Sequence, residues 1–385
     1  MKCVTSLILL TWLVASFAQQ LNNTQFDVIV IGGGPSGLSA ASGLSRVLRK
    51  VALFDSGDYR NKPTRHMHDV IGSDHVVPTE FRAAARKQIA FYNTTTFFDE
   101  KVVSLNATGN PVIFTATIAN GSSYSARKVI LGSGLKDDLP AVPGLREAFG
   151  KGIYWCPWCD GFEHRDQRIG VLGNLSDAYD SVRELHPTLN QDIRVFANGT
   201  ANDTFQLNRI AGKNPKWSAV FAAYNVTVNN DAIQNITRVQ SGEEVYDQAL
   251  RREFDKFRVY FANGSFEECG ALMCNYGTSQ ASALPAQLGV RMIGGKIDTT
   301  APGLRTSVKG VWGVGDANSD NSTNVPHAMA SGKRAAVYCH VEMASEELAQ
   351  IGSNATKRRT LPEPGQVELE MGVGVEDIYR ALRMR

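Results

Sequence analysis

Residues 26–37 read FDVIVIGGGPSG, an apolar run of strand length that ends directly in a glycine-rich loop. A helix-like pattern follows, and a second apolar run at residues 51–54 ends at Asp55. Strand, glycine loop, helix, strand and acid in this order are typical of the βαβ unit that binds a dinucleotide. A coincidental glycine turn is the alternative, and the complete order disfavours it.

The residues of this loop have separate tasks in such a unit. Gly32 permits a tight turn, Gly34 lets the backbone approach a pyrophosphate, and Gly37 allows the helix to pack closely on the strand. The start of the helix offers amide groups and a dipole to the phosphates. Asp55, 18 residues beyond Gly37, can bind ribose hydroxyls. The predicted cofactor-binding residues of the loop are Gly32, Gly34, Pro35, Ser36 and Gly37.

A second motif, Trp-Cys-Pro-Trp-Cys-Asp-Gly, places Cys156 and Cys159 around a two-residue spacer. Such a pair can close and open a small disulfide ring with little backbone movement, which suits thiol–disulfide exchange. Asp160 follows at once and can carry the second proton. The alternatives are a structural disulfide and half of a zinc site, for which Cys269 and Cys274 offer a loose second pair.

The composition excludes several classes of protein. The chain has 385 residues, of which 43% are hydrophobic, so two or three domains with ordinary buried cores are possible. A formal net charge of +2 indicates no polyanionic partner, and nucleic acid is not expected to bind. No run is long enough to predict a membrane span.

The first 18 residues are typical of a cleaved secretory signal peptide, because Lys2 precedes an apolar run at residues 7–14 and small residues follow. A buried first helix is the alternative. Twelve asparagines also begin an Asn-x-Ser/Thr triplet, where ordinary residue usage gives roughly three. They are Asn22, Asn93, Asn106, Asn120, Asn174, Asn198, Asn202, Asn225, Asn235, Asn263, Asn321 and Asn354. Both signals predict an N-glycosylated protein that is secreted or resides in the secretory pathway.

Residues 168–177 indicate a second nucleotide-binding unit with a degenerate loop. The strand pattern ends at Gly173, but Asn174 and Leu175 follow where a pyrophosphate needs close approach to the backbone. The next strand, at residues 193–196, is followed by no cluster of arginines for a 2′-phosphate. A nicotinamide cofactor is therefore not expected to bind there.

Other histidines and acidic residues are candidate site residues, although no complete motif surrounds them. His66 and His68 are interpreted as solvated loop residues, and a position near the cofactor is the alternative. Asp316 ends a strand pattern in Gly-Asp, and an alanine-rich helix is predicted to begin at His327 and run to about residue 346.

Together these motifs resemble the low-molecular-weight thioredoxin reductase family of flavoproteins, over residues 26–345 approximately. In that family FAD lies across the first glycine loop, an acid after the second strand holds its ribose, and a late Gly-Asp contacts its ribityl-phosphate region. The resemblance assigns these roles to Gly32, Gly34, Gly37, Asp55 and Asp316. It also implies that Cys156 is the exchanging sulfur and Cys159 the one facing the flavin. Asp160 is then the proton carrier, with His327 as a second candidate.

The resemblance implies an α/β fold with two Rossmann-like dinucleotide-binding domains, of which the FAD domain is discontinuous and contains an inserted redox-disulfide domain. The family's usual homodimer is expected. The predicted segments are a signal peptide at 1–18, the FAD-binding domain at 22–144 and 278–346, an inserted NADPH-domain-like segment at 145–277, and a C-terminal linker and helix at 347–385.

The degenerate second loop, the Asp58-Tyr59-Arg60-Asn61 segment and the His66-Met67-His68 segment look closer to the fungal gliotoxin-type dithiol oxidases. We therefore predict an FAD-dependent enzyme that oxidises a small-molecule or protein dithiol, with molecular oxygen as acceptor, hydrogen peroxide as product and no metal. A secondary metabolite is one class of small dithiol that fits. The alternatives are an NADPH-dependent, thioredoxin-like disulfide reductase and a non-catalytic flavin-binding redox sensor.

Overall fold

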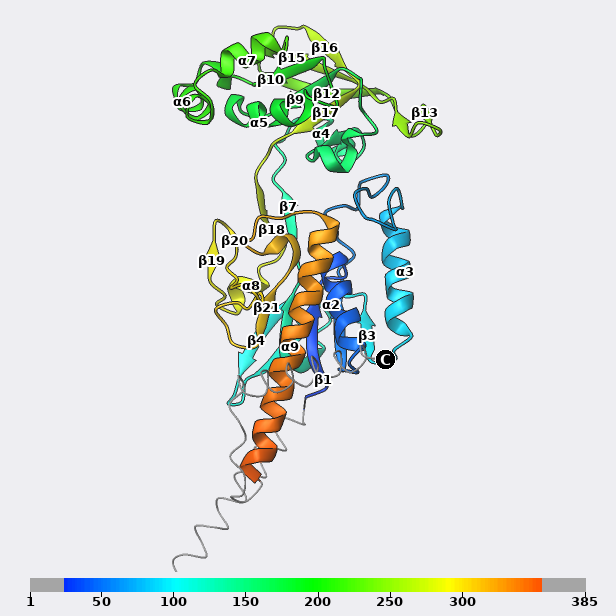
Figure 1. The fold of residues 1–385 in the computed structure, drawn as a ribbon, viewed down its shortest axis with the longest axis vertical. Helices are drawn as coiled ribbons and strands as arrows, with labels where there is room; N and C mark the ends of the chain where they lie inside the picture. The colour runs from blue at the N-terminus through cyan, green and yellow to red at the C-terminus, as the bar shows by residue number, and fades with distance from the viewer. Residues whose placement is uncertain (1–23, 355–385) are drawn as a thin grey trace, which may run out of the picture. The chain divides into compact units, whose positions relative to one another are not determined.

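A computed structural model describes residues 24–354, and Figure 1 shows the fold. The predicted signal peptide, the sequon at Asn22 and the predicted tail beyond residue 354 lie outside the described residues. The chain divides into two compact units, Met1–His340 and Val341–Arg385. The described part of the second unit, residues 341–354, is helical. Among the described residues, no helix combines the length and the apolar character that a membrane span requires.

The first unit contains a seven-stranded sheet. Its strands are β1 (Phe26–Ile31), β2 (Val51–Phe54), β3 (Thr95–Phe98), β4 (Val102–Thr108), β5 (Ile113–Ile118), β6 (Ser123–Leu131) and β21 (Val311–Gly313). The order is β3-β2-β1-β6-β5-β4, with β21 also paired to β6. The pairs among β3, β2, β1, β6 and β21 are parallel, whereas β4, β5 and β6 form an antiparallel meander.

Helices cover this sheet because β2 and most of β1 are apolar and buried. β1 is buried from Val28 to Ile31. Helix α2 (Pro35–Ser45) begins in the glycine loop and contacts β1, while α3 (Pro78–Ala90) packs against α2 (Figure 1). Helix α9 (Val325–Asn354) also lies close to α2, since a Cβ on Gly332 would be 2.0 Å from the Ser36 carbonyl oxygen.

Helix α9 begins two residues before the predicted start at His327. The Asn324 side chain explains the difference, because its oxygen accepts a hydrogen bond from the His327 amide at 2.8 Å and caps the helix.

A second, parallel sheet forms from the middle of the chain in the order β11-β10-β9-β17-β8. Its strands are β8 (Ile153–Tyr154), β9 (Ile169–Leu172), β10 (Ile193–Phe196), β11 (Thr227–Asn229) and β17 (Ala271–Cys274). The helices that follow its strands are α5 (Leu175–Leu185), α6 (Thr204–Lys213) and α7 (Trp217–Ala223). An antiparallel sheet of β12 (Ile233–Gln240), β15 (Lys256–Phe261) and β16 (Phe266–Cys269) accompanies it.

Two short strands, β7 (Leu135–Asp137) and β18 (Thr278–Gln280), pair where the chain enters and leaves this middle segment. The remaining α-helices and β-strands are α4 (Leu145–Ala148), α8 (Leu284–Gln287), β13 (Tyr246–Asp247), β14 (Arg252–Glu253), β19 (Met292–Ile293) and β20 (Lys296–Ile297). The predicted α/β fold with two Rossmann-like sheets is confirmed, and the exact domain boundaries stay predictions.

Candidate active site

A cavity of about 1360 Å³ in the first unit joins the glycine loop to the cysteine pair. Its walls include residues 32–36 after β1, residues 132–134 after β6 and residues 155–159. The carboxyl ends of parallel strands are where open α/β sheets bind ligands. Small-ligand pockets commonly enclose about 300–1000 Å³, so this cavity is large enough for a dinucleotide together with a substrate.

The glycine loop fits a pyrophosphate. Gly32 has a φ of +104°, and a Cβ there would lie 2.3 Å from the Gly132 carbonyl oxygen, so a side chain does not fit. A Cβ on Gly34 would meet no atom within 4 Å, which leaves the loop open toward the cavity. The Ser133 hydroxyl on the same wall is buried and has no hydrogen-bond partner among the described residues. A buried hydroxyl of this kind indicates that a ligand atom completes the site.

Asp55 lies at the glycine loop, as predicted. Its carboxylate is buried and accepts hydrogen bonds from the Gly57 amide at 3.0 Å and from the Tyr59 hydroxyl. Burial, with the Asp55 hydrogen bond, raises the pKa of Tyr59 to about 12, so the phenol stays protonated and donates. A carboxylate accepts more than two hydrogen bonds, so Asp55 can still hold a ribose hydroxyl. Tyr59 belongs to the Asp58-Tyr59-Arg60-Asn61 segment, whose pattern does not predict this hydrogen bond.

Arg60 belongs to the Asp58-Tyr59-Arg60-Asn61 segment of the resemblance, and the structure shows its contacts. Its guanidinium donates to both oxygens of Asp137, at 2.9 and 2.6 Å, and to Asp316 Oδ2 at 3.0 Å. Burial raises the pKa of Asp316, and the charge of Arg60 opposes that shift. Arg60 also lies 5.0 Å from the ring centre of Trp155, next to the cysteine pair. One arginine therefore links the late Gly-Asp to the redox segment.

Cys156 and Cys159 form a disulfide with Cα atoms 5.2 Å apart, at the start of a short π-helix, Pro157–Gly161. Both cysteines are half-buried and line the cavity. Between them, Trp158 is exposed over 67% of its surface. A disulfide on a cavity wall is accessible to a ligand, which distinguishes this pair from a buried structural bridge.

Asp160 follows the pair with a perturbed carboxyl group. Its Oδ2 is buried and has no hydrogen-bond partner among the described residues. Burial raises the pKa of Asp160 to about 7, against the lowering effect of His164 and His68. A carboxyl with a pKa near neutrality can both take up and release a proton under working conditions.

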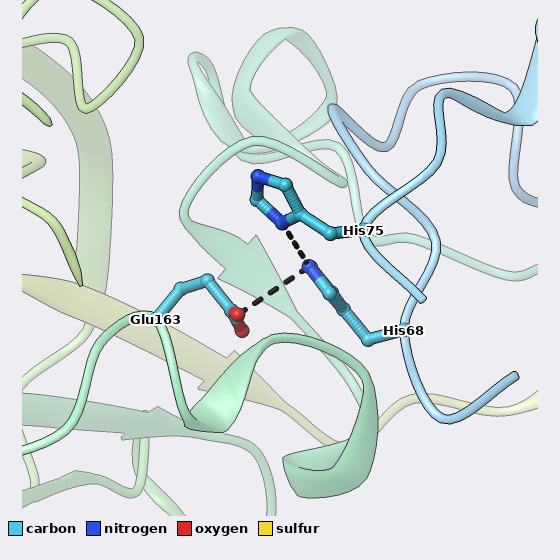
Figure 2. A group of neighbouring side chains, drawn as sticks. All are labelled: His68, His75 and Glu163. Atoms are coloured by element: carbon cyan, nitrogen blue, oxygen red, sulfur yellow. Dashed lines mark hydrogen bonds and ion pairs between the residues drawn. The ribbon is translucent and has the colours of Figure 1, made fainter. Parts of the chain in front are cut away.

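The prediction that His68 is a solvated loop residue is wrong. Its Nδ1 donates to the Cys159 carbonyl oxygen, and its Nε2 lies 3.0 Å from His75 Nδ1 and 3.3 Å from Glu163 Oε1 (Figure 2). The backbone explains the contact, because Met67 pairs with Val76 and reverses the chain so that His75 reaches His68. Burial lowers the pKa of His75 to about 4, so His75 is neutral.

A second polar cluster contacts the helical turn Pro157–Gly161 through the backbone of Asp160. His164 Nδ1 donates to the Asp160 carbonyl oxygen at 2.9 Å, and its Nε2 lies 3.2 Å from Asp255 Oδ2. Arg65 forms two hydrogen bonds with Asp255, at 2.8 and 2.9 Å, and one with Glu253. These partners hold the pKa of Asp255 well below its ordinary range, although burial alone would raise it. The Asp255 carboxylate is therefore ionised, with Arg65 and His164 as its side-chain partners.

The remaining sequence candidates lie elsewhere. Cys269 and Cys274 are buried free thiols, and the described residues place neither of them in a metal-binding group, so the zinc alternative has no support. Burial raises the pKa of Cys269 to about 12. His327 Nε2 lies 2.9 Å from Asp320 Oδ2, and His327 does not line the cavity described above. Its catalytic role stays a prediction.

The second nucleotide loop is closed by the protein itself. The Leu175 side chain is buried at the start of α5, and its amide donates to the Thr200 hydroxyl at 3.1 Å. The Asn174 side chain bonds Asp177, whose carboxylate adds negative charge to the first turn. A phosphate would have to displace the hydroxyl and approach that charge. The geometry thus agrees with the degenerate sequence.

Comparisons with known proteins identify the family of this chain. Residues 26–174 match the family described as pyridine nucleotide-disulphide oxidoreductase. The chain is 50% identical over 329 residues to a protein of Arthroderma benhamiae named "Probable thioredoxin reductase", a match that covers 84% of this chain and 81% of the relative. It is 32% identical over 354 residues to a thioredoxin reductase of Gibberella zeae, covering 82% and 97% of the two chains.

A solved structure gives the same result. The crystal structure of HlmI superposes with a TM-score of 0.73 at 28% identity, covering 86% of this chain and 96% of that one. The chain therefore belongs to the thioredoxin reductase-like family of pyridine nucleotide-disulphide oxidoreductases, which are FAD-binding flavoproteins.

Proposed function

We propose that this disulfide oxidoreductase is a dithiol oxidase that uses the Cys156–Cys159 disulfide to form a disulfide in its substrate. The observation that carries the proposal is one cavity that contains the glycine loop and the disulfide, in a chain whose second nucleotide loop is closed. Residues 32–37, Asp55 and Asp316 would hold FAD. When bound, FAD supplies a two-electron acceptor that molecular oxygen reoxidises, with release of hydrogen peroxide.

The cysteine pair performs the exchange in two steps. A substrate thiolate attacks the Cys156 sulfur, a mixed disulfide forms, and the Cys156–Cys159 bond breaks with release of the Cys159 thiolate. The second substrate thiolate then attacks the substrate sulfur of the mixed disulfide and releases the Cys156 thiolate. The substrate has lost two electrons and two protons, and the protein holds two reduced cysteines.

Asp160 is the residue that we assign to proton transfer, because the second substrate thiol must lose its proton before it attacks. An ionised Asp160 accepts that proton as a general base. Since the pKa of Asp160 is raised to about 7, the base form is populated only as the pH increases through neutrality. Asp160 therefore sets the pH at which exchange becomes fast.

The substitution Asp160→Asn should change the pH dependence of kcat/KM. Wild-type kcat/KM for a dithiol should rise as the pH increases through about 7, and the variant should lose this rise. Above the pKa the variant should be roughly 100-fold slower, because general-base catalysis is absent, and well below it the two proteins should differ little. Asp166→Asn, on an exposed side chain of the same segment, should keep the wild-type profile. An unchanged profile in Asp160→Asn would exclude this carboxyl as the base.

The surface beside the disulfide favours a small apolar dithiol as substrate. Trp158 and Phe162 are exposed over 67% and 52% of their surfaces. Exposed aromatic rings bind flat or apolar ligands by stacking and burial. We therefore infer that the substrate is a small-molecule dithiol, of the kind found among secondary metabolites, rather than a protein dithiol.

The predicted secretory location suits an oxidase. A thioredoxin-like pair has a potential of about −270 mV and a secretory compartment about −200 mV, so about 3 kcal/mol favours the disulfide. Nine of the ten sequon asparagines within residues 24–349 are exposed, and Asn174 is half-buried. These nine positions are accessible to glycosylation. Treatment of the secreted protein with an N-glycosidase should increase its gel mobility, and unchanged mobility would contradict the location.

An NADPH-dependent reductase is the second candidate, because the A. benhamiae and G. zeae relatives carry the name thioredoxin reductase. Oxygen consumption distinguishes the two. A small dithiol should support oxygen uptake with one hydrogen peroxide formed per disulfide, and NADPH should support none. A protein that reduces thioredoxin with NADPH and gives no peroxide with dithiols would overturn the oxidase, and a protein inactive in both assays would be a redox sensor.

A further inference from the structure

The cluster of His68, His75 and Glu163 brings three ligand atoms to one point (Figure 2). His68 Nε2 lies 3.0 Å from His75 Nδ1 and 3.3 Å from Glu163 Oε1, and all three atoms are within 4.8 Å of one another. Ligand atoms at about 2.1 Å from a tetrahedral Zn²⁺ ion lie roughly 3.4 Å apart. The observed spacing is therefore close to that of a preformed metal site.

The hydrogen bonds of the rings fix which nitrogen faces inward. A carbonyl oxygen only accepts, so the bond to Cys159 puts a proton on Nδ1 of His68, and in the neutral ring this leaves a lone pair on Nε2. That lone pair faces the Glu163 carboxylate oxygen. Two electron-rich atoms at this distance repel each other unless a proton or a metal ion lies between them. The outer Nε2 of His75 lies 3.2 Å from the Tyr246 hydroxyl, so both rings have the anchored outer nitrogen that metal-binding histidines have.

The neighbouring polar cluster is a useful contrast. There Arg65 supplies the cation that the buried carboxylates of Glu253 and Asp255 require. Glu163 is also buried, with 3% of its surface exposed, yet no lysine or arginine nitrogen of residues 24–354 lies within ion-pair distance of it. A buried carboxylate is costly without a cationic partner. The cluster of His68, His75 and Glu163 thus has no arginine that corresponds to Arg65 in the cluster of Glu253 and Asp255.

The backbone at His75 supports the same interpretation. His75 has a φ of +63°, a left-handed conformation that is uncommon for residues other than glycine. Such a conformation persists where surrounding contacts fix it, and it occurs often at functional sites. Here it directs the imidazole of His75 toward His68.

We propose that His68 Nε2, His75 Nδ1 and Glu163 Oε1 bind a divalent transition-metal ion of the Zn²⁺ class. Two imidazoles and one carboxylate form a ligand set that suits Zn²⁺ rather than Ca²⁺ or Mg²⁺. A water molecule would supply the fourth ligand, as in zinc sites that have three protein ligands. Through the hydrogen bond of His68 to Cys159, the ion fixes the loop at residues 66–76 against the redox segment.

The test measures binding to the full, disulfide-intact protein and needs no turnover, so its result is independent of the proposed oxidase activity. After removal of metal with a chelator, equilibrium dialysis against Zn²⁺ should give one ion per chain. Co²⁺ should give the visible spectrum of a four-coordinate site with nitrogen and oxygen ligands and no sulfur-to-cobalt band. Zn²⁺ should also raise the thermal unfolding midpoint, since it binds only the folded state.

Matched variants assign the ligands. Glu163→Gln and His75→Gln should each weaken Zn²⁺ binding at least about 100-fold. His66→Gln should bind like wild type, because His66 stacks on His75 at 3.9 Å but lies outside the cluster. Absence of stoichiometric Zn²⁺ and Co²⁺ binding by the wild-type chain would overturn the proposal, whether or not the variants fold. Binding that Glu163→Gln leaves unchanged would overturn it as well and leave a proton-linked hydrogen-bond network.

Discussion

Cys159→Ser should lower dithiol-dependent peroxide release by roughly a thousandfold or more. The variant cannot form the disulfide with Cys156, so the substrate thiols have no disulfide to reduce. Their electrons then have no route to the flavin. The bound flavin should keep its visible spectrum, because Cys159 is not part of the glycine loop. The measurement is initial peroxide formation at saturating dithiol, normalised to flavin content.

Cys269→Ala is the matched control for that experiment. Cys269 is a buried free thiol outside the pair, and its raised pKa makes it unreactive near neutrality. The control should keep wild-type activity after correction for any loss of stability. If Cys159→Ser retained activity within about tenfold of wild type, electrons would reach the flavin directly from the substrate, and the exchange mechanism would be wrong.

Gly34→Asp should remove FAD from a chain that still folds. A Cβ at this position meets no protein atom within 4 Å, so the new side chain projects into the cavity without a clash. There its charge opposes the pyrophosphate. Like charges about 4 Å apart repel by about 4 kcal/mol at an effective dielectric constant of about 20, which weakens binding about a thousandfold. Flavin content after purification and the circular dichroism spectrum measure the two effects.

Gly212→Ala is the control, because the space around the Cβ position is equally free at Gly212 and at Gly34. Gly212 lies in α6, and a Cβ there also meets no atom within 4 Å, but it does not line the cavity. This variant should retain full flavin and be slightly more stable, since alanine favours a helix. Full flavin occupancy in Gly34→Asp would show that the dinucleotide does not approach the loop at this residue.

The sequence predicted the parts of the site that depend on local geometry. The glycine loop and Asp55 follow one another along one βαβ unit, so their spacing carries the information. The cysteine pair could be predicted for a similar reason, because its two-residue spacer alone determines that a small disulfide ring can form. The closed second loop could also be predicted, because Leu175 stands at a position that requires a small residue.

The contacts that support the pair could not be predicted, because they join distant segments. His68 reaches the Cys159 carbonyl across 91 positions of the chain, and Arg65 reaches Asp255 across 190. Neither spacing has a periodicity that a sequence pattern could reveal. The sequence also predicted no metal, since His75 and Glu163 come together only through the chain reversal at residues 67–76. The pattern around Arg60 likewise does not predict its ion pairs with Asp137 and Asp316, which are 77 and 256 positions away along the chain.

The most direct test of the electron route is an anaerobic titration of the purified yellow protein. A small dithiol in one cell and NADPH in another are each added in steps while the flavin absorbance is recorded. We predict that one dithiol per flavin removes the yellow band and that NADPH leaves it intact. Rapid loss of the band on addition of NADPH, with no response to the dithiol, would contradict the account.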